Sequence, residues 1–266
     1  MSRIRICVVI GLQQSLEDVL QEAQEVAAAA KDSELFDTVY ELIGQEATAE
    51  NIKSKLSEAV RGLRDNSLLV LFYAGHGYFE SGFTWIKTAE APIALQKEVF
   101  EHVKQLRQHD GTTSRDSLDF GFVFSCCRVA DPDGLQDCDT SPPDYRALAG
   151  DTIIELHACQ QGSCVVDSVL LGFALAYYLR KKPADFESML QSVSTDVRYL
   201  SIDRIQPYTK KVVSNLGMAR IPHFFYRICV CSTHTHTHTS SLDGSVLVVS
   251  RGTSYTCSAI DSSCVA

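Results

Sequence analysis

The sequence predicts an α/β fold in which helices cover both faces of a mainly parallel sheet. Two observations support this prediction. Apolar runs typical of strands alternate with segments whose apolar residues recur at the period of a helix. Strands that alternate with helices in this way build parallel sheets. Two of the runs, 68–74 and 120–124, are apolar at nearly every position, which is typical of strands buried on both faces.

The amino-terminal elements alternate regularly. Residues 4–10 predict a first strand, and residues 15–30 carry apolar side chains at helical spacing. Residues 36–42 alternate enough for a second strand, which we expect nearer an edge of the sheet. A second helix is predicted at 48–63, and it leads into the apolar strand at 68–74.

The middle of the chain contains one more helix and two more strands. Residues 78–91 predict a hairpin or loop, and residues 95–108 a helix that leads to the strand at 120–124. The composition then changes to Asp, Gly, Ser and Pro over residues 130–150, which predicts an exposed and mobile linker. The next predicted element is a strand at 152–159.

The last predicted elements are two helices. The first, at 169–180, is apolar nearly all round, so we expect it to be buried; the second spans 183–197. Residues 1–225 therefore form one domain that contains the linker. Residues 226–266 are of low complexity and end in a serine-rich stretch, which predicts a disordered tail or an error of gene prediction.

The tail also holds three alternating histidines. No carboxylate or cysteine stands at a zinc-finger spacing from them, although two cysteines lie close by in the sequence. We therefore expect no metal and no cofactor. The residues are His234, His236 and His238, and the nearby cysteines are Cys229 and Cys231.

Composition excludes several classes of function. The net charge of −9 and the pI near 5.3 argue against a nucleic-acid surface, and no basic stripe is present. No run reaches the roughly 18 apolar residues that a membrane helix needs. The apolar start is interrupted by Arg5 and lacks a small-residue cleavage site, so we expect a strand there and not a signal peptide. With Cys7 in a core strand, the 10 cysteines suggest reduced thiols in a cytoplasmic protein.

The two most apolar strands each end in reactive residues. His76 stands between Gly75 and Gly77 after one strand, and Cys126 and Cys127 follow the other. Residues just past the carboxyl ends of neighbouring parallel strands meet at one edge of the sheet. A buried cysteine is by itself usually only a small apolar residue, and a glycine-flanked turn is common. Together, however, a cysteine and a histidine at one edge form a thiolate–imidazolium pair that can act as a nucleophile.

These segments resemble the caspase-like cysteine peptidases, the group that includes caspases, metacaspases and paracaspases. The most specific match is the histidine segment at 72–78 (FYAGHGY), and the segment at 124–128 (FSCCR) is similar to the cysteine motif. The histidine lies about 50 residues before the cysteine, as in caspases. Weaker landmarks of the family, over a match of about 4–208, are found at 8–11, 47–52, 157–159, 172–173 and 206–208.

The resemblance implies a three-layer sandwich, with the linker between a large and a small half, and a cysteine endopeptidase. Aligned on the Cys-Arg pair, Cys127 is the nucleophile, and His76 is the general base and acid. The backbone N–H groups of Gly77 and Cys127 would stabilise the oxyanion. Adjacent strand residues point to opposite sides, so we expect Cys126 to be buried against a helix. The implied role is proteolytic signalling or programmed cell death on protein or peptide substrates, by a monomer or homodimer.

Three positions depart from the family pattern. Ser125 stands where family members carry Gln or Asp, Val129 replaces the caspase glycine, and the loop after the first strand is short. By resemblance Asp167 is the acidic residue of the substrate pocket, with Asp151 a weaker candidate, so we expect a basic P1 residue. Two other functions stay open: an inactive caspase-like scaffold, and an α/β thiol hydrolase that acts on a small acyl substrate.

Overall fold

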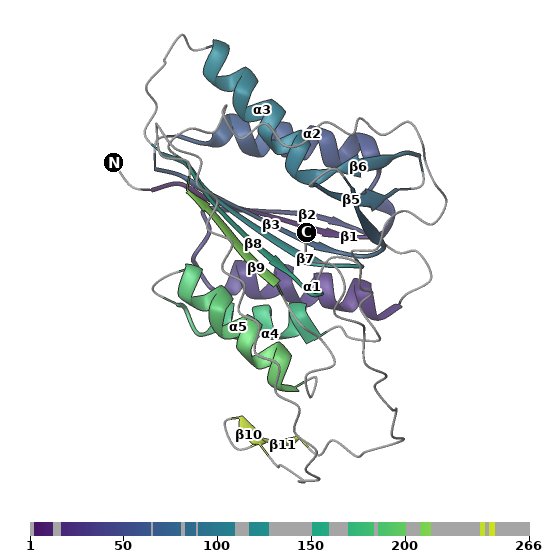
Figure 1. Cartoon of the computed structure of the whole chain (residues 1–266), viewed down its shortest axis with the longest axis vertical. Coiled ribbons are helices and arrows are strands. Elements are labelled where there is room, and N and C mark those ends of the chain that lie inside the picture. The colour runs from purple at the N-terminus through teal and green to yellow at the C-terminus, as the bar shows by residue number, and fades with distance from the viewer. Residues whose placement is uncertain are drawn as a thin grey trace, which may run out of the picture. The chain divides into compact units, whose positions relative to one another are not determined.

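The centre of the unit Met1–Ile221 is a six-stranded sheet with strand order β2-β1-β3-β7-β8-β9 (Figure 1). All neighbouring strands pair in parallel except the last two, β8 and β9, which are antiparallel. In sheet order the strands are β2 (Thr38–Ile43), β1 (Arg5–Gly11), β3 (Leu68–Ala74), β7 (Asp119–Ser125), β8 (Thr152–His157) and β9 (Tyr208–Val213).

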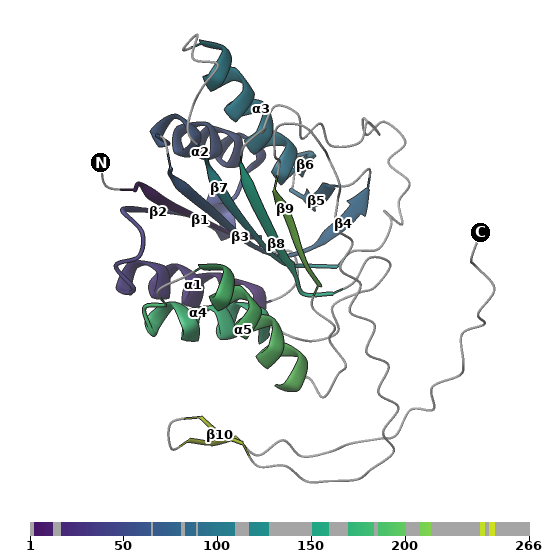
Figure 2. The same ribbon diagram turned by 60° about the vertical axis from the view of Figure 1, so that its left-hand side comes forward.

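Helices cover both faces of this sheet, which confirms the predicted three-layer α/β architecture (Figures 1 and 2). The lower layer in Figure 1 consists of α1 (Glu17–Asp32), α4 (Leu170–Arg180) and α5 (Phe186–Leu200). The upper layer consists of α2 (Ala49–Gly62) and α3 (Leu95–His109). A short 3₁₀ turn, η1 (Gly44–Glu46), connects β2 to α2.

The structure is a computed structural model. It describes residues 3–12, 17–64, 66–80, 83–88, 90–109, 117–127, 151–159, 170–183, 186–200, 208–213, 240–242 and 245–247. The whole predicted linker at 130–150 lies outside these residues.

The upper layer packs on an aromatic row along β7. Phe120, Phe122 and Phe124 are buried and stack along the strand, with ring centroids 6.4 and 6.2 Å apart. Phe100 of α3 meets the edges of the first two rings. Aromatic pairs in these geometries add to the gain from apolar burial. The row therefore fixes β7, and with it the cysteine pair at its end, against α3.

The lower layer approaches the sheet closely because α1 presents small side chains to it. Ala23, Ala27 and Ala30 are buried, and a Cβ added at Gly11 of β1 would lie 2.6 Å from the Cβ of Ala23. Helix α4 packs against α1 in the same layer. Small residues at both surfaces let α1 lie nearly in contact with the backbone of β1.

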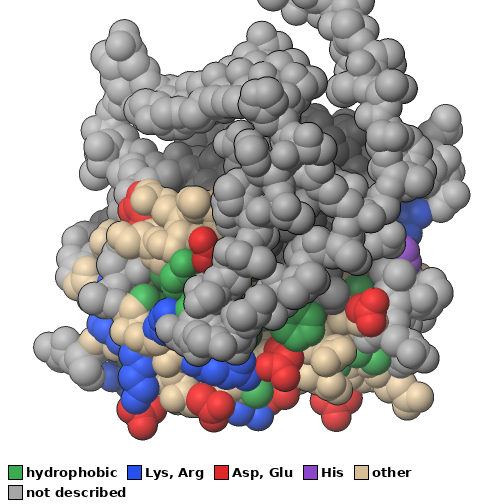
Figure 3. All heavy atoms as spheres, turned by 90° about the horizontal axis from the view of Figure 1, so that it is seen from below, with side chains coloured by type: hydrophobic (Ala, Val, Ile, Leu, Met, Phe, Trp, Pro, Cys, Tyr) green, Lys and Arg blue, Asp and Glu red, His purple; other side chains and the backbone are tan. Residues whose placement is uncertain are grey.

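Figure 3 shows the molecule from the side of the lower layer, and acidic and basic side chains are interspersed on its described part. Ion pairs connect the segments of this side: Arg180 with Glu25 and Lys182 with Glu34, at 2.7 and 2.8 Å. Exposed pairs of this kind each add little to stability. The described surface here has mixed charge and no basic stripe.

The structure corrects the prediction in three places. The segment after His76 is a three-stranded antiparallel sheet, β4 (Gly77–Glu80), β5 (Phe83–Lys87) and β6 (Pro92–Ala94), where we expected only a hairpin or loop. The edge strand β9 was not predicted. Helix α4 is buried on one face only, and its aromatic face is partly exposed. Tyr177 and Tyr178 lie there, where their polar hydroxyls can reach water or a partner such as Asp196.

The unit Pro222–Ala266 is separate. Its described residues form one antiparallel hairpin of β10 (Ser240–Leu242) and β11 (Ser245–Leu247). The three histidines of the tail lie outside the described residues. Of the helices that the structure describes, none combines the length and apolar character that a membrane span requires.

We predict that a chain ending at Phe225 folds cooperatively, with a free energy of unfolding within about 1 kcal/mol of the full chain. The reason is that Met1–Ile221 contains the whole main sheet and both helix layers. Urea unfolding followed by circular dichroism measures the difference. A chain ending before β9 is the control and should lose much more stability. Loss of cooperative unfolding in the chain ending at Phe225 would contradict the prediction.

Candidate active site

His76 and Cys127 occupy equivalent positions beyond two neighbouring strands. In the parallel pairing of β3 with β7, Ala74 lies opposite Ser125, the last residue of each strand. His76 and Cys127 each follow two residues later. The in-phase register therefore brings both side chains to the same carboxyl edge of the sheet, where ligands of open parallel sheets bind. Both residues are partly exposed.

The turn that carries His76 is held by hydrogen bonds. The backbone N–H of Gly75 donates to the carbonyl of Ser125 at 3.3 Å, so the turn is tied directly to the end of β7. The His76 carbonyl accepts from the backbone N–H of Lys87 at 3.4 Å and from the Tyr73 hydroxyl at 2.5 Å. Gly75 has φ of 151°, a backbone conformation that favours glycine.

Tyr73 is a buried donor beneath this turn. Burial raises the pKa of its hydroxyl well above the ordinary value, and the neighbouring Cys126 and Cys127 raise it further. The hydroxyl therefore stays protonated and keeps its hydrogen bond to His76 at any physiological pH.

The two cysteines differ in burial. Cys126 is 2% exposed, whereas Cys127 is partly accessible. The expectation that Cys126 is buried is confirmed, and it belongs to the core on the side of α2 and α3; its Sγ lies against Gly77 at the start of β4. A Cβ added at Gly77 would be 2.8 Å from this Sγ and 3.0 Å from the Trp85 carbonyl oxygen. Gly77 thus lets the histidine turn lie directly on the cysteine pair. Its role in oxyanion binding stays a prediction.

Two other cysteines are buried in the described part of the chain. Cys159 follows β8 and its thiol donates to the Cys126 carbonyl at 3.5 Å, so it supports the backbone of the cysteine pair. Burial raises the pKa of Cys7 in β1 to about 12, which keeps that thiol protonated and unreactive. Cys127 is the one cysteine among the described residues that is not buried.

A second histidine near this edge is fully buried. His157 ends β8, stacks on Phe124 with ring centroids 5.1 Å apart, and has its Nε2 3.2 Å from Oε2 of Glu155. The His157 side chain is 0% exposed and is held between Phe124 and Glu155. His157 therefore stabilises the packing of β7 against β8, and of these two histidines His76 is the one that is partly exposed.

Glu22 is a site residue that the sequence reasoning missed. It lies on α1 and is 1% exposed, and its Oε1 accepts from the backbone N–H of Gly172 at 2.6 Å. Its carboxylate also accepts a hydrogen bond from the Ser125 side chain. A Cβ added at Gly172 would overlap the Glu22 side chain, so only glycine allows α4 to approach this closely. Glu22 thus connects the end of β7 to the first turn of α4.

Burial raises the pKa of Glu22 to about 7, although its hydrogen bonds to Gly172 and Ser125 lower it. The carboxyl group therefore changes charge near neutral pH. The signal in the sequence was its position: Glu22 lies three residues after Val19 and four before Val26, on the apolar face of the helix. A carboxylate on that face predicts a buried acid, but not its partner.

The other predicted site residues are not all brought together. Ser125 is buried beside Glu22, whereas Asp167 lies outside the described residues. Asp151 lies at the opposite edge of the sheet, before β8, where it accepts from Arg107 at 2.7 Å and from the Leu118 N–H at 2.8 Å. This position makes Asp151 a structural anchor and excludes it from a pocket at the carboxyl edge. No group of three or more metal-ligating side chains occurs among the described residues.

The sequence and the fold are similar to those of known proteins. The family model described as the caspase domain matches residues 4–226. Protein GSU0716 from Geobacter sulfurreducens is similar in structure, with a TM-score of 0.56 and 14% identity, over 79% of this chain and 94% of that protein. Caspase-1 from Spodoptera frugiperda is similar with a TM-score of 0.53 and 10% identity, over 80% of this chain and 88% of that enzyme. No curated protein matches the sequence. At these identities the two structures show a shared fold.

We predict that Gly77→Ala destabilises the protein by about 1–3 kcal/mol, the usual cost of an inserted methyl in a packed site. The new methyl would collide with the Sγ of Cys126 and with the backbone of Trp85. Because the thiol is one of the two obstacles, Cys126→Ala should recover part of the loss in the double variant. Urea unfolding of both single variants and the double variant measures this coupling. Strictly additive losses would show that the two residues do not touch.

Proposed function

The chain belongs to the caspase domain family of cysteine peptidases, and we propose that it is an active cysteine endopeptidase in which Cys127 is the nucleophile. The observation that carries the proposal is the shared position of His76 and the partly exposed Cys127 beyond the paired ends of β3 and β7. A thiol next to an imidazole is the arrangement that activates a cysteine for attack on a carbonyl carbon.

The reaction proceeds in two stages. His76 takes the proton of the Cys127 thiol, and the thiolate attacks the carbonyl carbon of the scissile peptide bond. The N–H groups of Gly77 and Cys127 donate to the oxyanion that develops. His76 then gives its proton to the leaving amine, which leaves an acyl-enzyme thioester. Water, deprotonated by His76, attacks the thioester and releases the carboxylic acid and the free thiol.

The hydrogen bonds around the turn hold the backbone of His76 in a defined position. The Tyr73 hydroxyl and the Lys87 N–H hold the His76 carbonyl, and the Gly75 N–H holds the turn to β7. These three contacts restrain the backbone of the turn that carries the imidazole. Positioning of this kind contributes to catalysis by reducing the entropy lost in reaching the transition state.

The proposed P1 preference is basic, and Glu22 supports it. Ser125, two residues before the nucleophile, stands where the family's pocket residue is found, and Glu22 is its hydrogen-bond partner. Glu22 is 1% exposed, so a P1 side chain would have to reach it past Ser125; a desolvated carboxylate is then the partner that a buried guanidinium or ammonium group requires. Asp167 is a second candidate carboxylate by resemblance. The substrates would be proteins or peptides cut after Arg or Lys in cytoplasmic proteolytic signalling or programmed cell death.

We predict that a fluoromethylketone peptide with Arg at P1 labels the protein covalently, and that Cys127→Ala abolishes the labelling. Cys126→Ala is the matched control: it removes a buried thiol, costs about 1 kcal/mol of stability, and keeps the labelling. Intact-protein mass spectrometry gives the extent and the site of the adduct. If folded Cys126→Ala loses the labelling and Cys127→Ala keeps it, then the nucleophile is Cys126 and our assignment is wrong. No labelling of the wild type would favour an inactive scaffold.

We further predict that Glu22→Gln lowers the preference for Arg over the neutral isostere citrulline at P1 by about tenfold or more, the loss expected for a charge-assisted hydrogen bond. Because burial raises the pKa of Glu22 to about 7, the carboxylate forms as the pH rises through neutrality. The ratio of kcat/KM for the two substrates should therefore increase with pH in the wild type and stay flat in Glu22→Gln. Any effect of pH on His76 and Cys127 changes kcat/KM for both substrates alike, so it cancels in the ratio.

Glu25→Gln provides the control for this experiment, since Glu25 is on the same helix but pairs at the surface with Arg180. It should leave both the ratio and its pH dependence unchanged. A stability measurement tests the titration of Glu22 separately. The folded pKa is above the unfolded value, so this group favours folding at low pH and loses that contribution as the pH rises through about 7. A wild type that gains stability relative to Glu22→Gln over this range would contradict the assignment.

A further inference from the structure

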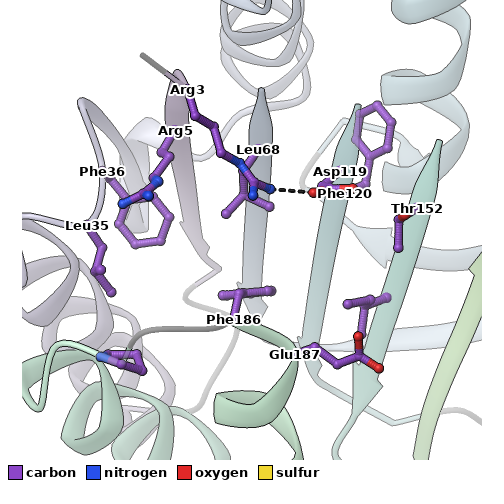
Figure 4. Close-up of a pocket in the computed structure, with 12 residues that line it drawn as sticks. Arg3, Arg5, Leu35, Phe36, Leu68, Asp119, Phe120, Thr152, Phe186 and Glu187 are labelled. Carbon is purple, nitrogen blue, oxygen red and sulfur yellow. Dashed lines mark hydrogen bonds and ion pairs between the residues drawn. The ribbon is translucent and has the colours of Figure 1, made fainter. Parts of the chain in front are cut away.

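A cavity lies at the opposite edge of the sheet from the candidate active site. It has a volume of about 270 Å³ and is formed where β1, β7 and β8 begin, below the sheet and beside the start of α5 (Figure 4). One water molecule takes up roughly 30 Å³ in the liquid, so the cavity is large enough for a compact organic molecule. No residue of the catalytic proposal lines it.

The charges of this cavity are not all neutralised. Arg3 forms an ion pair with Asp119 at the first residue of β7 (Figure 4). Within the described part of the chain, no carboxylate pairs with the Arg5 guanidinium, which also lines the cavity. The guanidinium group presents parallel N–H donors that match a planar carboxylate in two-point contact. Arg5 is thus the cation available to a ligand.

The floor of the cavity is apolar, and Phe186 of α5 is one of the residues that line it. Gly121 faces the lower layer, and the ring of Phe186 from α5 lies on it so closely that an added Cβ would overlap the ring. Leu68 and Ile154, on the strands to either side, complete the floor and are nearly buried. An apolar surface of this kind binds a hydrocarbon or aromatic group.

The acidic residues limit the charge of the ligand. Asp119 and Glu187 also line the cavity, so a doubly charged group such as a phosphate ester would be repelled by their carboxylates. A ligand with a single negative charge placed at Arg5 is therefore favoured over a doubly charged one. A large ligand is excluded by the volume, which lies below the range of typical drug-sized pockets.

We propose that this cavity binds a monocarboxylate with a compact apolar body, the carboxylate at Arg5 and the body on the floor beside Phe186. The ligand is either a free arylalkanoic or short branched-chain acid or the carboxyl terminus of a peptide with an apolar last residue. This site goes beyond the proposed peptidase function and does not depend on it.

The experiment uses the full chain and phenylacetate as the probe, with phenylacetamide and phenethylammonium as its neutral and cationic counterparts. Titration followed by ¹H–¹⁵N chemical shifts should give saturable binding of phenylacetate with a dissociation constant on the order of 1 mM, as expected for so small a ligand. Phenylacetamide should bind about tenfold more weakly, because it lacks the charge-assisted hydrogen bonds.

Arg5→Gln should weaken phenylacetate by about the same factor and leave phenylacetamide unchanged. Arg5 is exposed, so the substitution should not unfold the protein. Arg61→Gln is the matched control, since Arg61 is an exposed arginine of the upper layer that donates to Ser57. It should leave all three affinities as they are.

A short alanine peptide ending in phenylalanine, used with its carboxyl-terminal amide as reference, separates the two sources. If the free-acid peptide binds more tightly than phenylacetate, the ligand is the carboxyl terminus of a peptide. If it binds more weakly, the ligand is a free acid. Equal binding of acid and amide, stronger binding of phenethylammonium, or no saturable binding of any probe would each overturn the proposal.

Discussion

The in-phase parallel pairing of β3 with β7 is the constraint on which the candidate site depends. Both strands end at the same level, Ala74 opposite Ser125, so the residues that follow them diverge from one point. The pairing is held by burial on both faces, with the phenylalanine row of β7 against α3 above and α1 and α4 below. A slip of one residue would turn each side chain to the other face and separate the histidine from the accessible cysteine.

Two glycines make the surroundings of these strand ends possible. Gly77 lets the histidine turn lie on Cys126, and Gly172 lets α4 lie on Glu22. In each case a backbone occupies the volume that a side chain would need. Close packing therefore limits which residues can stand at both positions, independently of any catalytic role. The Cys126 thiol and the Glu22 carboxylate are each buried because a glycine lets the neighbouring backbone pack against them.

Glu22 illustrates how packing between layers creates a titratable group near neutral pH. Its carboxyl group joins the end of β7 to the first turn of α4, and desolvation brings its pKa to about 7. A surface glutamate with the same hydrogen bonds would be ionised at all physiological pH values. The helix that supports the sheet therefore also supplies a titratable group directly behind the cysteine strand, while Tyr73 stays neutral on the other side.

The sequence alone predicted the layers of this fold and the candidate reactive residues at the ends of two strands. Apolar runs and helical spacing are local signals of burial, so they revealed the parallel strands, the helices, His76 and the cysteine pair. Contacts between distant segments have no such local signal. The antiparallel direction of β9, the place of Cys126 against Gly77, and the meeting of Glu22 with Ser125 and Gly172 join residues far apart in the chain. Only the tertiary structure decided these features, because they arise from how the layers pack and not from the residues of any one segment.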